Sequence, residues 1–126
     1  MKLRIKGPSL RLRLTQGEVR ALAESGRVED EVPFGGGTRF VYRLSRDAAA
    51  TRISASFAGG LLEVRLPEAL AREWCASQEV TLAGIQEAAS PALRITVEKD
   101  FACLAPRTDE DESDNFPHPN SGTQVC

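Results

Sequence analysis

The sequence predicts a small domain of the α+β class, built mainly from antiparallel strands in one sheet or a sheet pair. Three observations predict this class: eight stretches alternate apolar with polar residues, turn-forming residues separate them, and two segments space their apolar residues as a helix does. With 126 residues, 41% of them apolar, the chain can enclose one core of moderate size and is too short for two. We therefore expect one domain over residues 1–104.

The first half of the chain predicts a hairpin, a helix and a second hairpin. Alternating residues fill 2–14 and 27–44, and each stretch is interrupted once by turn-forming residues. Between them, Thr15 and Glu18 have the spacing of a capping box, and Gly26 is suited to end the helix that follows. The helix is expected near residues 16–25. The two turns fall at Gly7-Pro8-Ser9 and at Gly35–Gly37.

The second half predicts the same succession. Alternation covers residues 53–66 and 80–97, which we interpret as two further hairpins. Pro67 stands where proline is favoured at the start of a helix, and that helix carries Trp74 toward the core. The breaks within the hairpins are Gly59-Gly60 and the polar loop 86–91.

The two halves match when the chain is aligned with itself at an offset of 52 residues. We interpret the match as an internal duplication, with one repeat over about residues 1–46 and the other over about 51–99. Because a lone pair of hairpins cannot bury its apolar face, the repeats are expected to pack about a pseudo-twofold axis. The paired positions include Gly7/Gly59, Leu12/Val64, Arg13/Arg65 and Leu22/Trp74.

Charge divides the chain unequally. Residues 1–99 hold 15 Lys or Arg against 12 Asp or Glu, whereas residues 100–126 hold 1 against 6, so a body of charge +3 carries an end of charge −5. Residues 105–126 have little to bury and are expected to form a disordered acidic tail. Its candidate docking residues are five acids and one apolar anchor: Asp109, Glu110, Asp111, Glu112, Asp114 and Phe116.

Four strings of the sequence together resemble a small bacterial protein family of unknown function. They span most of the chain: MKLRIKGPSLRLRLTQGEV, RLPEALAREW, RITVEKDFACL, and the acid run that closes in FPHP. The resemblance implies a bacterial, cytoplasmic protein. It implies no reaction, cofactor or catalytic residue.

The first hairpin is the sharpest electrostatic feature. Its cations would share one face of the paired strands and could hold phosphate or another polyanion. The competing interpretation is a solvated face whose long side chains cover the sheet. The candidate anion-binding residues are Arg4, Lys6, Arg11, Arg13 and the repeat counterpart Arg65.

A closed barrel would give several charged residues a different role. They would then line a tunnel, as in enzymes that bind triphosphates, although the sequence has no Glu-x-Glu-x-Lys run and the small core needs its leucines inside. The tunnel residues would be Arg11, Arg13, Glu29, Glu31, Arg43, Glu63, Arg65 and Glu98.

The C-terminal segment also contains residue types that bind metals, namely Cys103, its five acids, His118 and Cys126. These ligands mix hard and soft types without the spacing of an EF-hand or a zinc knuckle, so a solvated acidic tail is favoured over a divalent-metal site. Three cysteines without paired spacing indicate reduced thiols in a cytoplasm. We predict no cofactor, no catalytic residue and no membrane span, and the charge pattern does not favour nucleic acid.

Our leading hypothesis is a non-enzymatic binding or accessory module. Its acidic tail would dock on a basic surface of its own body or of a protein partner. A protein or enzyme that uses the first hairpin to bind a small molecule containing phosphate is one alternative. A divalent-metal site in the C-terminal segment is the other.

Overall fold

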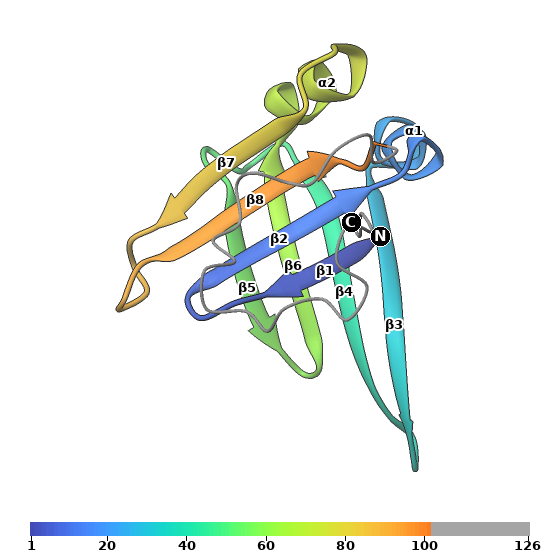
Figure 1. Cartoon of the computed structure of the whole chain (residues 1–126), viewed down its shortest axis with the longest axis vertical. Helices are drawn as coiled ribbons and strands as arrows, with labels where there is room; N and C mark the ends of the chain where they lie inside the picture. The colour runs from blue at the N-terminus through green and yellow to red at the C-terminus, as the bar shows by residue number, and fades with distance from the viewer. Residues whose placement is uncertain (102–126) are drawn as a thin grey trace, which may run out of the picture.

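The computed structural model describes residues 1–101 and confirms the α+β class (Figure 1). Eight strands and two helices follow one another in the expected order. The strands are β1 (Lys2–Ile5), β2 (Ser9–Leu14), β3 (Arg27–Gly35), β4 (Thr38–Asp47), β5 (Ser54–Ala58), β6 (Leu61–Pro67), β7 (Thr81–Gln86) and β8 (Leu93–Lys99), and the helices are α1 (Gln16–Ser25) and α2 (Glu68–Ala76).

The strands form two sheets of four. Sheet A has the order β1-β2-β8-β7 and sheet B the order β3-β4-β6-β5. Each sheet joins one hairpin from each half of the chain, and the joining pairs, β2 with β8 and β4 with β6, are parallel. Four of the six strand pairs within residues 1–101 are antiparallel, as expected, but the two parallel joining pairs make each sheet mixed. Alternation within a strand does not indicate the direction of its neighbour, so the sequence could not predict this pairing.

The core lies between the two sheets, whose strands cross in Figure 1, and both helices lie at one end of them. Leu12 and Val64, at equivalent positions of the predicted repeat, are each only 1% exposed, as their alternation predicts. The buried apolar residues are Leu10, Leu12, Leu14, Leu22, Leu44, Ile53, Leu62, Val64, Leu66, Ala71, Trp74, Leu82, Ile95 and Val97.

Helix α1 has local reasons to begin and end where it does. The Glu18 amide donates to Thr15 Oγ1 at 3.3 Å, and the Thr15 amide donates to Glu18 Oε1 at 2.9 Å, so the predicted capping box is confirmed. Gly26 ends α1 with a φ of 84°, a left-handed conformation that suits glycine. No helix within residues 1–101 has the length and apolar character needed to cross a membrane.

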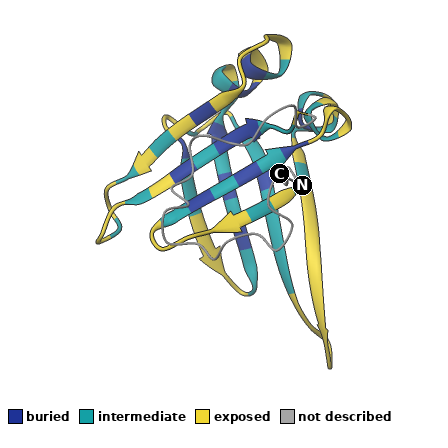
Figure 2. Cartoon of the chain, viewed as in Figure 1, coloured by how far each residue is buried: buried dark blue, intermediate teal, exposed yellow. Residues whose placement is uncertain are grey.

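The β3–β4 hairpin extends beyond the edge of sheet A, as Figure 1 shows. Its far end therefore has no second sheet above it, and β3 is exposed along most of its length (Figure 2). Phe34 is 69% exposed, and Phe57 on β5 is 65% exposed. Alternation predicted these strands correctly, but not all of their apolar residues lie in the core. How much of each strand the opposite sheet covers depends on the angle at which the two sheets cross, and alternation does not encode that angle.

A side chain links the two sheets where β7 lies next to β5. The Gln86 carboxamide oxygen accepts from the Ala55 amide at 2.7 Å, and its nitrogen donates to the Ala55 carbonyl at 3.0 Å. Ala55 is on an edge strand of sheet B and Gln86 on an edge strand of sheet A. One glutamine thus satisfies both backbone groups that Ala55 directs away from β6.

The amine of Met1 forms ion pairs with the carboxylates of Glu18 and Asp30. Burial alone would lower the pKa of this amine, but its hydrogen bonds to the two carboxylates, with their charges, raise the pKa above its ordinary value of 8.0. Burial alone would raise the pKa of Glu18, but hydrogen bonds from the Met1 amine and from the Thr15 backbone lower it below 4.5. The two shifts stabilise the folded state over a defined pH range.

We expect this contribution to be largest between pH 4.5 and pH 8.0, the ordinary values of the two groups. It should be lost as the pH falls through the lowered pKa of Glu18, and again as the pH rises through the raised pKa of the amine. The measurement is urea unfolding across pH for the wild type and for Glu18→Gln, which keeps a capping-box side chain without the charge. A stability difference between the two proteins that does not vary with pH would contradict this account.

Candidate anion-binding face

The outer face of sheet A collects basic side chains from three strands. Leu10, Leu12 and Leu14 of β2 point into the core, so the residues between them point outward. The same alternation in β8 directs Ile95 and Val97 inward. We call this outer surface the basic face, and its cations are Lys2, Arg4, Arg11, Arg13 and Arg94.

Strand register brings these cations together. Lys2 lies opposite Arg13, and Arg4 lies opposite Arg11, in the antiparallel pair of β1 and β2. Directly opposite residues in such a pair have Cβ atoms about 4.5–5.5 Å apart, so these like charges are close neighbours. Arg94 joins the face through the parallel pair of β2 and β8, where it lies opposite Ser9.

Few acids offset these charges within residues 1–101. Glu98 of β8 lies 2.5 Å from Arg13 Nε and 3.9 Å from Arg11 Nη1, and it is only 8% exposed. Asp100, just beyond β8, pairs with Lys2 at 2.9 Å. Among residues 1–101, two carboxylates thus lie among five cations, so the described part of this face carries an excess of positive charge.

Arg13 has unused hydrogen-bonding capacity on this face. Its side chain is 15% exposed and its Nε donates to Glu98. The Nη2 atom of Arg13 is buried and has no hydrogen-bond acceptor among the described residues. A buried guanidinium nitrogen without an acceptor is costly, so an oxygen from an anionic ligand would stabilise it.

The outer face of sheet B is a useful contrast, because its charges are more nearly balanced. Four arginines lie there among three glutamates, and the ion pairs between them range from 2.6 to 3.8 Å. The pairs are Arg27–Glu29, Arg39–Glu31, Arg43–Glu29, Arg43–Glu63 and Arg65–Glu63. Excess positive charge is therefore a property of sheet A and is not general to the strands of this fold.

The structure groups most, but not all, of the candidate anion-binding residues. Arg4, Arg11 and Arg13 lie on the basic face, and Lys6 follows β1 in the exposed turn, where its amide donates to the Ser9 carbonyl at 3.2 Å. Arg65 lies on β6 in sheet B, where it pairs with Glu63 at 2.6 Å, so it does not belong to the same site. Sequence reasoning missed Arg94, because only the parallel pairing places it beside the first hairpin.

The tunnel interpretation is wrong for the described residues. The chain forms two packed four-stranded sheets, and leucine, valine and isoleucine fill the space between them. The residues proposed to line a tunnel instead occupy positions that alternate with this core, on the outer faces.

Two predictions concern residues outside the described part of the chain. The docking residues Asp109, Glu110, Asp111, Glu112, Asp114 and Phe116 all lie beyond residue 101, as do Cys103, His118 and Cys126 of the metal hypothesis. Within residues 1–101 there is no group of three or more His, Cys, Asp or Glu side chains that could hold a metal ion. Both hypotheses about the C-terminal segment stay predictions.

Comparison with known proteins assigns the chain to a family. A family model described as a family of unknown function, DUF7009, matches residues 1–120, and the chain belongs to this family. No curated protein and no solved structure is similar enough to give a match. Any function must therefore be argued from the chain itself.

Proposed function

We propose that this protein is a non-catalytic binding module whose basic face binds an acidic peptide segment. The first such segment is the chain's own residues 109–116, and an acidic segment of a partner protein would compete for the same face. The observation that carries the proposal is that, in the described part of the chain, five cations lie with two carboxylates on the outer face of sheet A, whereas four arginines lie with three glutamates on that of sheet B. Charge complementarity of this kind selects partners by sign.

The position where the described chain ends supports its own segment as the ligand. The Asp100 amide donates to the Leu14 carbonyl at 2.8 Å, so the chain leaves sheet A at the edge of the basic face. Residues 101–108 can span up to about 25 Å when extended, which is enough for the acids to reach Arg13 and Arg11. The segment therefore starts beside the surface whose charge it complements.

The order of residues in the segment also fits the order of features on the face. At the far end of β8 from Asp100, Arg94 lies opposite Ile85 of β7, and Ile85 is 58% exposed. Six strand residues separate this end from Asp100, or about 20 Å. Acids at 109–114 would lie near the central arginines, and Phe116 would contact Ile85.

We test the proposal in the full-length chain by converting the five acids of residues 109–114 to their amides. We expect this variant to lose about 1–2 kcal/mol of stability at low salt, since each partly exposed ion pair contributes a few tenths of a kcal/mol or more. At high salt the difference from the wild type should shrink, because exposed charges are then screened. Urea unfolding over a salt series measures both effects.

A labelled peptide of residues 106–120 provides the second measurement. It should bind the amide variant, whose basic face is unoccupied, with a Kd that rises with salt, and should bind the wild type more weakly because the attached segment competes. Arg4→Ala in the amide variant should weaken binding, whereas the matched control Arg39→Ala, on sheet B, should not. Equal binding by the two alanine variants would rule out the basic face as the site.

A phosphate-containing small molecule is the second candidate ligand, favoured by the buried Nη2 of Arg13. The same assay distinguishes it, because tripolyphosphate would then displace the peptide far below the concentration at which sulfate does. Displacement that follows ionic strength alone would favour the peptide.

We also propose that the fold arose by duplication, with repeats over about residues 1–46 and 51–99. Exchanging the elements of the two halves turns the strand order of sheet A into that of sheet B, which supports the proposal. Closely equivalent backbone contacts add support: the Val41 amide donates to the Gly60 carbonyl at 2.8 Å, and the Arg94 amide to the Pro8 carbonyl at 2.9 Å. On this account the basic face is a specialisation of one of two similar surfaces.

A further inference from the structure

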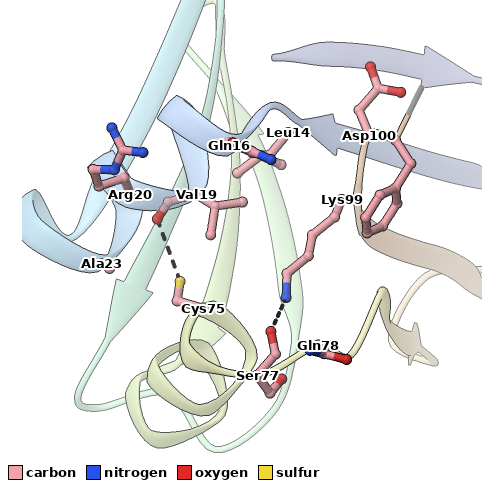
Figure 3. A pocket seen from close by; sticks show the side chains of 11 residues that line it. Leu14, Gln16, Val19, Arg20, Ala23, Cys75, Ser77, Gln78, Lys99 and Asp100 are labelled. Carbon is pink, nitrogen blue, oxygen red and sulfur yellow. Dashed lines mark hydrogen bonds between the residues drawn. The ribbon is translucent and has the colours of Figure 1, made fainter.

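A groove of about 900 Å³ separates the two helices at the end of the sheets (Figure 3). We call it the helix groove. One wall is α1, another is the C-terminal end of α2, and the third is the ends of β2 and β8. Its apolar lining is Leu14, Val19, Ala23 and Cys75, together with Phe101.

Cys75 belongs to this apolar lining. Its Sγ donates to the Val19 carbonyl at 3.7 Å, which holds the thiol between the helices as Figure 3 shows. Burial raises the pKa of the Cys75 thiol above its ordinary value, and the charges of Lys99 and Arg46 only partly oppose that rise. The thiol is therefore neutral at physiological pH and suited to contact an apolar neighbour.

The chain reaches the edge of this groove where its described part ends. Phe101 lines the groove and is 60% exposed, so the groove is open to solvent on the side of Phe101. The preceding residue is fixed, because the Asp100 amide donates to the Leu14 carbonyl and its carboxylate pairs with Lys2. The next four residues, Ala-Cys-Leu-Ala, are the last largely apolar ones before Pro106 and the acids.

We propose that residues 102–105 bind in the helix groove as an extended segment. Side chains two residues apart in an extended chain share one side, so Cys103 and Ala105 would face the groove with Phe101. Cys103 lies two residues from Phe101, a span of about 7 Å, and on this proposal its thiol would approach Cys75 on the α2 wall of the groove. The occupant of the groove is thus this chain's own segment.

Disulfide formation reports this arrangement, because a disulfide needs Cα atoms roughly 4.4–6.8 Å apart with converging side chains. Diamide supplies the oxidising equivalents: one thiolate adds to its N=N bond and the other displaces the adduct. The products are the disulfide and the hydrazine form of the reagent, which has taken up two electrons and two protons. The Cys126→Ser variant of the full chain leaves only Cys75 and Cys103 to react.

The test places the second cysteine at each of residues 102–105 in turn. The length of chain between this cysteine and the fixed Asp100 changes little across these positions. In full-length Cys103→Ala/Cys126→Ser protein, Ala102→Cys, Leu104→Cys and Ala105→Cys are compared with Cys103 in the Cys126→Ser variant. We expect positions 103 and 105 to form the disulfide with Cys75 about tenfold faster than 102 and 104, since only two of the four face the groove. Peptide mapping identifies the linkage, and circular dichroism checks that each variant is folded.

Rates that change smoothly from position 102 to 105 would overturn the proposal, because a tether without bound structure gives no alternation. The proposal would also be overturned if Cys126, in a Cys103→Ser variant, reacted with Cys75 as fast as Cys103 does in the Cys126→Ser variant. The proposal is independent of the acidic segment's binding: apolar contacts in the groove should keep the alternation at high salt, whereas binding to the basic face should weaken. Failure of one therefore leaves the other testable.

Discussion

Trp74→Ala is expected to lower the free energy of unfolding by about 3–5 kcal/mol, the range for truncating a fully buried large aromatic residue. Trp74 of α2 is 0% exposed and belongs to the core cluster between the sheets. Its Nε1 donates to the Val80 carbonyl at 3.2 Å, and Lys99 Nζ lies 5.1 Å from the ring centroid. The substitution removes the packing, the hydrogen bond and the cation–π contact together.

The measurement is urea unfolding followed by circular dichroism, because the variant has no other tryptophan to report by fluorescence. Trp74→Phe is the matched control: it keeps an aromatic ring but loses the Nε1 donor, so its cost should be clearly smaller. A loss below about 1 kcal/mol for Trp74→Ala would mean that this side chain does not organise the core as described.

Glu98→Gln is expected to affect stability and binding in opposite directions. Removing the charge leaves Arg13, only 15% exposed, without its closest carboxylate partner. The loss should be about 2–3 kcal/mol, below the roughly 3–5 kcal/mol for breaking a fully buried pair, because both side chains retain some contact with water. The basic face gains one net positive charge, so the peptide of residues 106–120 should bind the amide variant described above about fivefold more tightly at low salt.

Glu63→Gln is the control that separates the two effects. Glu63 is 14% exposed and contacts Arg65 and Arg43 on the outer face of sheet B. Its loss should also destabilise the fold, but it should not change peptide affinity. Equal gains in affinity for the two variants would show that total charge, and not the basic face, governs binding.

Much of the fold could be predicted because its signals are local. The capping box at Thr15 and Glu18 defined the start of α1, and Gly26 its end. Strand alternation correctly predicted which side of β2 and β6 is buried. The parallel pairing of β2 with β8 could not be predicted, because it depends on how two distant hairpins meet and no local pattern encodes that choice.

The candidate site was only partly predictable for the same reason. Arg4 and Arg11 lie in one hairpin, so their common face follows from short-range register. Arg94 and Glu98 join that face through contacts more than 80 residues apart in sequence, such as Arg13 with Glu98. The predicted repeat suggested that Arg65 acts with Arg13, yet equivalent strands of the two halves belong to different sheets.

The bond between Gln86 and Ala55 has a consequence for how this protein meets its neighbours. An edge strand with unsatisfied backbone groups can recruit a strand from another molecule, which leads to fibrils or unwanted dimers. At Ala55 both groups already have a partner in the same molecule, so an incoming strand would have to displace the glutamine before it could pair. A single amide side chain thus protects the Ala55 position of this exposed strand against self-association.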